Sequence, residues 1–289
     1  MPFLTFVTTC RSRLSHLQKS LPTFVAQPDT AVVVVDYDCP ERSGDWVEKT
    51  FPQVTVVRAP GRPRFELSRA RNLGAAAVVE SPWVCFIDAD IRLAPDFLSR
   101  VRPLLTPGHY YQAKPRNIET WGTSICAVSD YDRVGGYDEV LQGWGKDDDD
   151  FYARMVLAGV RGATFPGELL LAMSHDDGQR VAHYDVKDRW VNESINHVYC
   201  RAKIDLSLVR QAPVPLDVRR RLYDQIRASV LKAHETGEPL QITVPFMSQD
   251  TRACGPLEAR LLYVLPRPRG EGTPKVGGNT SLIPRPNQR

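Results

Sequence analysis

The chain has 289 residues, of which 42% are hydrophobic and 25% are charged, and its formal net charge is +3. These values are typical of a globular protein with one large domain, or one domain and an appendage, and the small net charge argues against nucleic acid as the main partner. No apolar run approaches the roughly 20 residues that cross a bilayer and the N-terminus lacks a signal-peptide pattern, so we expect a cytoplasmic protein whose cysteines, none of them in a CxxC pair, are reduced.

The first hundred residues alternate between strand and helix patterns. Apolar runs rich in β-branched residues predict strands buried on both faces, at 3–9, 31–38, 54–59 and 83–88. Helical spacing between and after them predicts helices, in "RLSHLQKSLP" (13–22), "SRARNLGAAAVVE" (68–80) and "PDFLSRVRPLL" (95–105). This alternation predicts an α/β domain with a mainly parallel sheet.

The pattern changes after residue 108. "HYYQAK" (109–114) and "TSICAVS" (123–129) are typical of strands, but no full crossover helix lies between them. "DDDDFYARMVLAG" (147–159) predicts a helix and "ELLLAMSH" (168–175) predicts a last strand. From about residue 186 the pattern is helical, and beyond Gly237 proline and glycine become frequent.

Two carboxylates, Asp88 and Asp90, stand at the end of the buried run 83–88. Ligands of open α/β sheets bind at the carboxyl ends of the strands. Two carboxylates at such an end suit a hard divalent cation that is shared with ligand phosphates. A pair of turn or cap aspartates is an equally simple interpretation of so short a motif.

Other charged residues are expected at the same edge. Asp36 ends another buried strand, and Arg71 in "ARN" (70–72) is placed where a guanidinium can bind phosphate oxygens. Arg11 and Arg13 follow the first strand and could do likewise, although a solvated surface charge is the simpler interpretation of Arg13.

A second group of residues lies in "GWGKDDDD" (143–150). Acids at the start of a helix are stabilised by its dipole, so a solvated capping cluster explains the aspartates. It does not explain Trp144, which stands between two glycines and suits the apolar face of a sugar. His175 ends the predicted last strand, where it is either a hydrogen-bonded side chain or a metal ligand beside Asp90.

Along the chain the motifs come in the order Asp36, "ARN" (70–72), D-x-D (88–90), "GWGKDD" (143–148) and His175. This ordered set resembles the inverting glycosyltransferases of the GT-A fold, above all family two and the animal β-galactosyltransferases. Bacterial chondroitin-type polymerases are similar in their C-terminal half. The resemblance covers roughly residues 3 to 180 and depends on the ordered set, not on any single motif. It implies a Rossmann-like nucleotide-binding sheet, followed here by a C-terminal helical appendage.

The resemblance also implies a donor site for a UDP-sugar. Asp36 would bind the uracil, and Arg71 would lie near the ribose or the diphosphate. Trp121 and Gly122 would line the pocket of the donor sugar. The complete implied donor set is Thr8, Thr9, Arg11, Asp36, Arg71, Asn72, Asp88, Ala89, Trp121 and Gly122.

Metal and acceptor residues follow from the same resemblance. Asp90 and His175 would bind Mn²⁺ or Mg²⁺, with Asp88 on the ribose, the ion or its bound water. The implied acceptor residues are Trp144, Gly145 and Asp147, and Asp148 would be the catalytic base.

This sequence departs from the family pattern at two of these places. Asp147 replaces the usual glutamate and is one methylene shorter, which puts its contact with the acceptor in doubt. The β-galactosyltransferases have a metal-binding methionine three residues before the histidine, where this chain has Ala172, and Met173 is not counted as a ligand.

Together these inferences predict a metal-dependent inverting transferase of a hexose or N-acetylhexosamine to a hydroxyl group, with a glycan as acceptor. We predict a transferase domain over 1–185, whose nucleotide-sugar half is about 1–107 and whose metal and acceptor half is about 108–185. A helical appendage is expected over 186–238 and a Pro/Gly-rich segment over 239–289, mobile from about 266.

A non-catalytic subunit of the same fold that binds a nucleotide sugar or a glycan is the alternative. A sugar-phosphate nucleotidyltransferase is disfavoured because no glycine follows the first strand, and a haloacid dehalogenase-type phosphatase because Arg92 stands where its motif has Thr or Val. The sequence does not identify the sugar, the acceptor or the oligomeric state. The basic run Arg219, Arg220 and Arg221 leaves peripheral membrane contact open, although a solvated helix face is the simpler interpretation.

Overall fold

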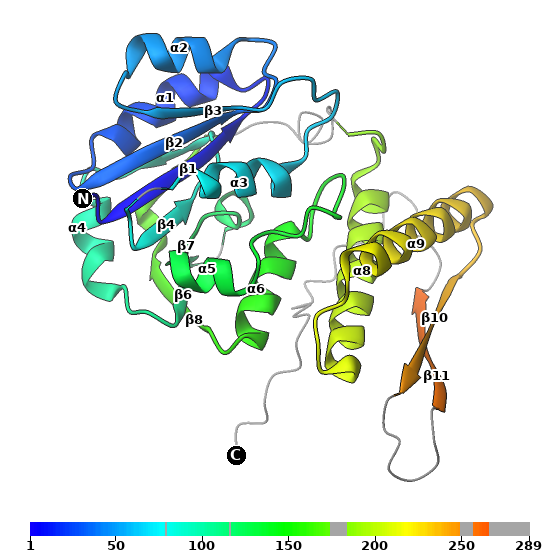
Figure 1. Cartoon of the computed structure of the whole chain (residues 1–289). Coiled ribbons are helices and arrows are strands. Elements are labelled where there is room, and N and C mark those ends of the chain that lie inside the picture. Colours follow the sequence, from blue (N-terminus) through cyan, green and yellow to red (C-terminus); the bar gives the residue numbers. More distant parts are fainter. Residues whose placement is uncertain (79, 116, 174–183, 249–256, 266–289) are drawn as a thin grey trace. The chain divides into compact units, whose positions relative to one another are not determined.

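The computed structural model describes every residue except 79, 116, 174–183, 249–256 and 266–289, so the predicted mobile tail lies outside the described residues (Figure 1). The chain forms two units. Unit 1 comprises Met1–Glu139 and Asp150–His183, and unit 2 comprises Val140–Asp149 and Tyr184–Arg289. This division differs from the predicted one because the segment 140–149 belongs with the C-terminal residues. Each unit is described by itself.

Unit 1 is built on a seven-stranded sheet with strand order β3-β2-β1-β4-β7-β6-β8. The strands are β1 (Leu4–Cys10), β2 (Thr30–Asp36), β3 (Thr55–Arg58), β4 (Trp83–Phe86), β6 (His109–Lys114), β7 (Ser124–Ala127) and β8 (Arg161–Pro166). β1 pairs in parallel with β2 and β4, β2 pairs in parallel with β3, and β6 with β8. Only the β7 pairings with β4 and β6 are antiparallel in this sheet.

Helices cover both faces of the sheet because its central strands are apolar on both sides. The helices of unit 1 are α1 (Leu14–Val25), α2 (Ser43–Thr50), α3 (Leu67–Ala76), α4 (Phe97–Val101), α5 (Val128–Arg133) and most of α6 (Asp147–Leu157). Phe6 and Val34 pack in one core with residues of α1, α2 and α4. Their neighbours Val7 and Val35 pack in another with α3, α5 and α6. The alternation of side chains along each strand produces this division.

Helix α3 approaches the sheet closely at Gly74. A Cβ atom there would lie 2.4 Å from Val7 Cγ1 and 2.9 Å from Val35 Cγ2. The glycine inside this predicted helix is therefore a packing requirement. Arg71, one turn earlier on the same helix, is buried as well.

A small second sheet lies beside the acidic pair. β5 (Ile91–Leu93) directly follows Asp90 and pairs antiparallel with β9 (Leu170–Ala172). Short 3₁₀ turns complete unit 1, at Arg102–Leu104, Ile118–Thr120 and Gly167–Leu169.

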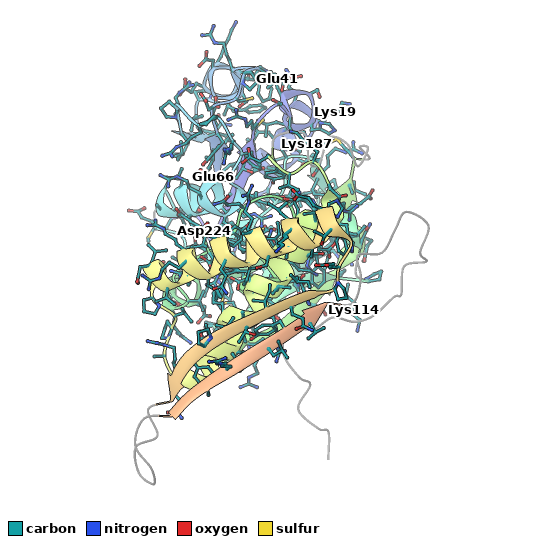
Figure 2. All side chains as sticks on the ribbon, turned by 90° about the vertical axis from the view of Figure 1, so that its right-hand side faces the viewer. Lys19, Glu41, Glu66, Lys114, Lys187 and Asp224 are labelled. Carbon is teal, nitrogen blue, oxygen red and sulfur yellow. The ribbon has the colours of Figure 1, made fainter. Side chains whose placement is uncertain are left out.

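Unit 2 combines two long helices with a β-hairpin. The helices are α8 (Arg189–Arg210) and α9 (Leu216–Thr236), and the strands are β10 (Leu240–Ser248) and β11 (Leu257–Leu265), which pair antiparallel. Figure 2 shows α9 crossing this unit above the hairpin, with Asp224 on its exposed face. Asp188 caps α8 by accepting the Val191 N–H, and Gly237 ends α9 in the left-handed conformation.

Several predicted elements are confirmed and others are wrong. The strand at 109–114 and the helix that begins with the acidic run at 147 are confirmed. The predicted strand 168–175 is a 3₁₀ turn followed by only three strand residues, Leu170–Ala172, and its end lies outside the described residues. It is not the last strand, because β10 and β11 follow in the segment predicted to be rich in proline and glycine. No helix among the described residues is long and apolar enough to span a membrane.

Candidate active site

The carboxyl ends of β1, β2 and β4 lie side by side, since these neighbouring strands are parallel. The last pair between β1 and β2 is Cys10 with Asp36. This edge of unit 1 therefore carries the start of the β1–α1 loop, the end of β2 and the D-x-D motif. Thr8, one of the predicted donor residues, is fully buried within β1, whereas Thr9 is half-buried.

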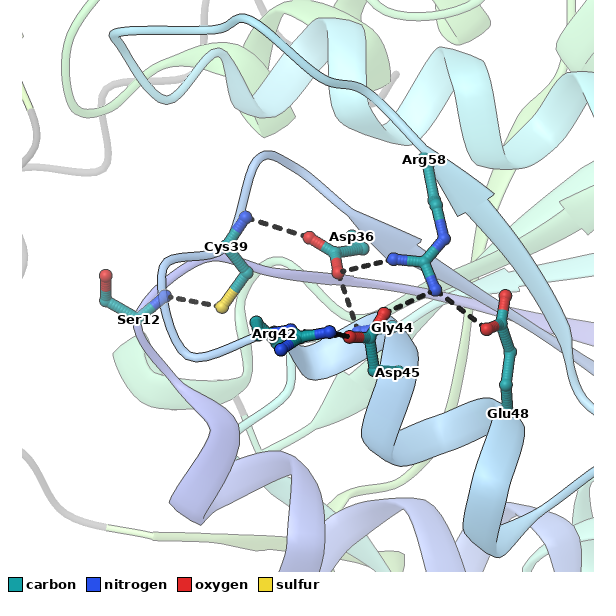
Figure 3. Close-up of polar contacts among 8 residues, drawn as sticks. All are labelled: Ser12, Asp36, Cys39, Arg42, Gly44, Asp45, Glu48 and Arg58. Carbon is teal, nitrogen blue, oxygen red and sulfur yellow. Dashed lines mark hydrogen bonds and ion pairs between the residues drawn. The ribbon is translucent and has the colours of Figure 1, made fainter.

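Asp36 organises the loop that follows β2 (Figure 3). Its Oδ1 accepts the Cys39 N–H at 2.8 Å and its Oδ2 accepts the Gly44 N–H at 2.7 Å. Arg58 Nη1 lies 3.7 Å from the same Oδ2. The Asp36 residue is only 5% exposed, and a Cβ atom on Gly44 would be 2.6 Å from Oδ2. Asp36 thus has a structural role that the sequence did not reveal, in addition to its predicted contact with the base.

Cys39 forms a coupled pair with Cys10 in this loop. Its sulfur accepts the Ser12 N–H at 3.3 Å. A hydrogen bond with the Cys10 thiol, helped by others from Ser43 and Ser12, lowers the pKa of Cys39. The same thiol–thiol contact and burial raise the pKa of Cys10. Both cysteines are free thiols, as predicted, and so are the other described ones; Cys254 lies outside the described residues.

The two arginines after β1 have different roles. Arg11 braces neighbouring loops, because its Nη1 donates to the carbonyl oxygens of Tyr37 at 3.1 Å and Arg62 at 2.5 Å. Arg13 lies against the D-x-D motif, with Nη1 3.5 Å from Asp90 Oδ2. The solvated interpretation of Arg13 is therefore wrong, since its side chain is 22% exposed and paired with an acid.

Arg71 is buried beneath the same motif. It is 2% exposed, its Nη2 donates to Asp88 Oδ1 at 3.1 Å, and its guanidinium lies 4.9 Å from the centre of the Tyr137 ring. An arginine held by a carboxylate and an aromatic face has a fixed orientation. This places its positive charge beside Asp88.

Asn72 is used inside unit 1. Its Nδ2 donates to Tyr137 O at 3.0 Å and Glu139 Oε1 at 2.9 Å. Its Oδ1 accepts the Tyr131 hydroxyl at 2.5 Å and the Tyr137 N–H at 2.8 Å. The amide therefore makes the four hydrogen bonds it can form, and Asn72 anchors the segment 131–139 instead of presenting free groups to a nucleotide.

The D-x-D carboxylates themselves are partly accessible. The side chains of Asp88 and Asp90 are 37% and 15% exposed. The chain after β9 passes beside them, since the Met173 N–H donates to the Asp90 carbonyl at 2.8 Å. His175 lies outside the described residues, and within those that are described no group of three or more His, Cys, Asp or Glu could hold a metal ion.

Trp121, predicted for the donor sugar, belongs to the aromatic core of unit 1. Its ring meets that of Tyr152 edge-on with centroids 5.7 Å apart, and the Tyr152 hydroxyl donates to its carbonyl at 2.9 Å. Trp121 remains half-buried beside Gly122.

The acidic run 147–150 does not consist of equivalent caps. Asp147 and Asp148 begin α6 and are half-buried. Asp149 pairs with Lys146 at 3.3 Å. Asp150, in unit 1, is fully buried and its Oδ2 accepts a hydrogen bond from Arg154 Nε at 2.8 Å. The predicted solvated capping cluster is therefore wrong for Asp150, which belongs to a buried ion pair.

The segment 142–146 of unit 2 forms hydrogen bonds and a cation–π contact with α8. Asn196 Nδ2 donates to the carbonyl oxygens of Gln142 and Gly145, at 3.0 and 2.8 Å. The guanidinium of Arg189 covers the Trp144 ring at 3.9 Å from its centre. No motif in the sequence pointed to these α8 residues, since the family resemblance ends at about residue 180.

His197 is a further titratable residue that the sequence analysis did not single out. Burial, together with the cations Lys146 and Arg201, lowers the pKa of His197, although Glu193 and Asp149 oppose the shift. A neutral imidazole is therefore held beside the segment at neutral pH.

Two family models match this chain. Residues 5–119 match glycosyl transferase family 2, and residues 109–176 match the N-terminal domain of galactosyltransferase. Chondroitin sulfate synthase 3 of Homo sapiens is 23% identical over 39% of this chain, and that of Mus musculus is 24% identical over the same share. The alignment spans only 16% of the length of each of these relatives.

Solved structures share the fold. The mannosyltransferase PcManGT from Pyrobaculum calidifontis, in complex with GDP-Man and Mn²⁺, has a TM-score of 0.56 at 17% identity, covering 82% of this chain and 76% of its own. S. aureus TarS in complex with UDP-GlcNAc also has a TM-score of 0.56, at 15% identity, covering 82% of this chain and 73% of its own. The two family matches and this fold identify residues 5–176 as a glycosyltransferase of the GT-A fold, similar to family two in its first part and to galactosyltransferases in its second.

Proposed function

We propose that this glycosyltransferase moves a hexose or N-acetylhexosamine from a UDP-sugar to a hydroxyl group of a glycan-type acceptor, with inversion and with a divalent cation. The observation that carries the proposal is the group of two carboxylates and two guanidiniums at one edge of the unit 1 sheet. Asp90 faces Arg13 at 3.5 Å and Asp88 accepts from Arg71 at 3.1 Å. Alternating charges of this kind suit a nucleoside diphosphate and its counter-ion.

The donor would be held by unit 1. Arg13 and Arg71 are assigned to the diphosphate, whose leaving oxygen gains negative charge as the sugar is transferred. Asp36 and the loop it organises are assigned to the base. Uridine is preferred because TarS binds UDP-GlcNAc, whereas the GDP-Man of PcManGT makes guanosine the nucleotide to test against it.

A divalent cation fits the acidic pair. Carboxylate oxygens are the ligands that Mg²⁺ and Mn²⁺ take, and Asp88 and Asp90 supply them at the end of β4. His175, which lies outside the described residues, is proposed as the third ligand from the family resemblance alone. When bound, the cation would neutralise charge on the leaving diphosphate.

The acceptor would be held by the segment 144–148 of unit 2. Trp144 and Gly145 are assigned to the sugar of the acceptor, and Asp147 to one of its hydroxyl groups. Asp148 is assigned as the general base that takes the proton from the attacking oxygen. Inversion follows from one direct displacement at the anomeric carbon, in which no enzyme nucleophile takes part.

Ligand binding and turnover can be tested separately. UDP-GlcNAc, UDP-GalNAc, UDP-Gal and UDP-Glc are compared with GDP-Man by their effect on the melting temperature, with and without Mn²⁺. UDP release is then measured with a panel of p-nitrophenyl glycosides, with and without EDTA. Asp90→Asn should weaken UDP binding in Mn²⁺ only, whereas the exposed control Asp96→Asn should not.

The possible results separate the hypotheses. Binding without turnover on any glycoside, including hydrolysis by water, would favour the non-catalytic subunit. Full activity in EDTA would show that transfer needs no divalent cation. A higher melting temperature with GDP-Man and with none of the UDP-sugars would show that the donor carries guanosine and not uridine.

A further inference from the structure

The segment 142–146 has a conformation that it cannot hold by itself. Gly143, Gly145 and Lys146 all lie in the left-handed region, with φ values of +75°, +93° and +72°. For Lys146 this conformation costs free energy, because its Cβ crowds the backbone. Such strain persists only where surrounding groups determine the conformation.

Those groups come from one stripe of α8. Arg189, Asn192, Glu193 and Asn196 are spaced three and four residues apart, so they share one face of the helix. Arg189 covers Trp144, Glu193 Oε1 pairs with Lys146 Nζ at 3.2 Å, and Asn192 Oδ1 lies where a Cβ on Gly143 would be only 1.9 Å away. Each residue of the stripe thus meets a different residue of the segment.

Asn196 stands at the centre of these contacts. It is 1% exposed, and its Nδ2 donates to Gln142 O at 3.0 Å and to Gly145 O at 2.8 Å, which lie on the two sides of Trp144. Its Oδ1 lies 3.0 Å from the hydroxyl of Tyr223, which is 2% exposed on α9 and accepts the Gln142 N–H at 3.2 Å. Both helices therefore hold the backbone of the same segment, α8 at Gln142 and Gly145 and α9 at Gln142.

We propose that α8 and α9 form a template that positions the acceptor segment, and that Asn196, supported by Tyr223, is its positioning residue. This assigns a role to the C-terminal residues, for which the family resemblance offers none. The inference rests on the proposed function, since Trp144 and Asp148 are the groups that the template would place. Misplacing a reacting group by about 1 Å can cost roughly 100-fold in rate.

Two variants disturb the template and one controls for stability. Asn196→Asp keeps the shape but replaces the donating amide by an acceptor that faces two carbonyl oxygens. Tyr223→Phe removes only the hydroxyl and keeps the ring, which packs edge-on to Tyr199 at 5.2 Å. Val230→Ala is the control. Val230 is buried in α9, so this substitution removes apolar packing from unit 2 and leaves the hydrogen bonds to the segment 142–146 in place.

The first measurement is deuterium uptake of residues 140–149. We expect faster exchange in Asn196→Asp and, to a smaller extent, in Tyr223→Phe than in Val230→Ala, even where Val230→Ala has the lower melting temperature. Equal uptake in all three variants would mean that the contacts only stabilise the unit, and it would overturn the inference.

The second measurement is sugar transfer to the p-nitrophenyl glycoside that the wild-type protein uses best. In Asn196→Asp we expect kcat/KM for this acceptor to fall by roughly 10- to 100-fold, while UDP affinity and UDP release to water stay within about twofold. If wild-type protein binds and turns over UDP-sugar but Asn196→Asp keeps its acceptor kinetics, the inference fails and the proposed function stands. If wild-type protein shows no turnover, the proposed function fails, and the uptake experiment still tests the template.

Discussion

Asp36→Asn should destabilise unit 1, because the carboxylate of Asp36 holds the loop after β2 with both of its oxygens. It accepts the Cys39 N–H at 2.8 Å and the Gly44 N–H at 2.7 Å. An asparagine has one acceptor oxygen, so its NH₂ group would face one of these N–H groups and leave it unpaired. A hydrogen bond to a charged group contributes about 1.5–3 kcal/mol, and an unpaired buried donor costs about 1–3 kcal/mol.

The expected loss is therefore about 2.5–6 kcal/mol in the free energy of unfolding. The pair with Arg58 adds little to this sum, since its side chain is 43% exposed and screened by solvent. For a unit of this size the loss corresponds to a melting temperature lower by about 5–24 °C.

Urea and thermal unfolding measure this effect, and the fluorescence of Trp46, two residues beyond Gly44, reports it locally. Asp38→Asn is the matched control. Asp38 is 42% exposed, and its left-handed backbone conformation is one that asparagine tolerates. It should change the free energy of unfolding by less than about 0.5 kcal/mol. A change this small in Asp36→Asn itself would refute the assigned role of the carboxylate.

Four other changes test separate parts of the structure. Gly74→Ala should lower stability by up to about 2 kcal/mol in urea unfolding, because overpacking against β1 and β2 costs about 1–3 kcal/mol and the gain in helix propensity is only about 1 kcal/mol; a more stable variant would contradict this. Asp148→Asn should lower turnover by roughly 10²–10⁴-fold and leave UDP binding unchanged by calorimetry; near-normal turnover would exclude it as the base. Asp150→Asn should instead lower the free energy of unfolding of unit 1 by about 3–5 kcal/mol, because it removes the buried carboxylate that pairs with Arg154; normal stability with lost turnover would move the catalytic role to Asp150. The folded state lowers the pKa of His197, so the unfolded chain binds more protons and stability should fall as pH drops below about 6.5; His197→Gln should flatten this part of the pH profile of the melting temperature, and an unchanged profile would speak against it.

The elements predicted correctly from the sequence are those whose apolar residues are buried in the sheet. The β-branched run of β2 and the apolar run of β4 identify strands on local grounds, and the carboxylates that end them follow from position in a parallel sheet. The hairpin of unit 2 was missed because Pro245 interrupts β10, and proline in such a run argues against a strand. In a two-stranded sheet every strand is an edge, which is where proline is tolerated.

The side-chain partners in the site could not be read from the sequence. Asn72 was assigned to the nucleotide, yet its amide binds backbone and side chains about 60 residues further along the chain. Arg13 was considered a surface charge, and only the sheet places it beside Asp90. The polar stripe of α8 is visible as a spacing, but nothing local indicates that it meets the segment at 142–146. Contacts of this kind depend on chain topology and not on periodicity.

The division of unit 2 into two stretches of sequence also sets an order of events during synthesis. Val140 and Leu141, which are about 5% and 6% exposed in the folded protein, leave the ribosome before the helices that belong to their unit. The 87 residues from 150 to 236 must follow. At about 5–20 residues per second this takes about 4–17 s. During that time Val140 and Leu141 lack the rest of their unit, and the segment 142–146 lacks the groups of α8 and α9 that hold its left-handed residues, so the turn can form only after those helices have been made.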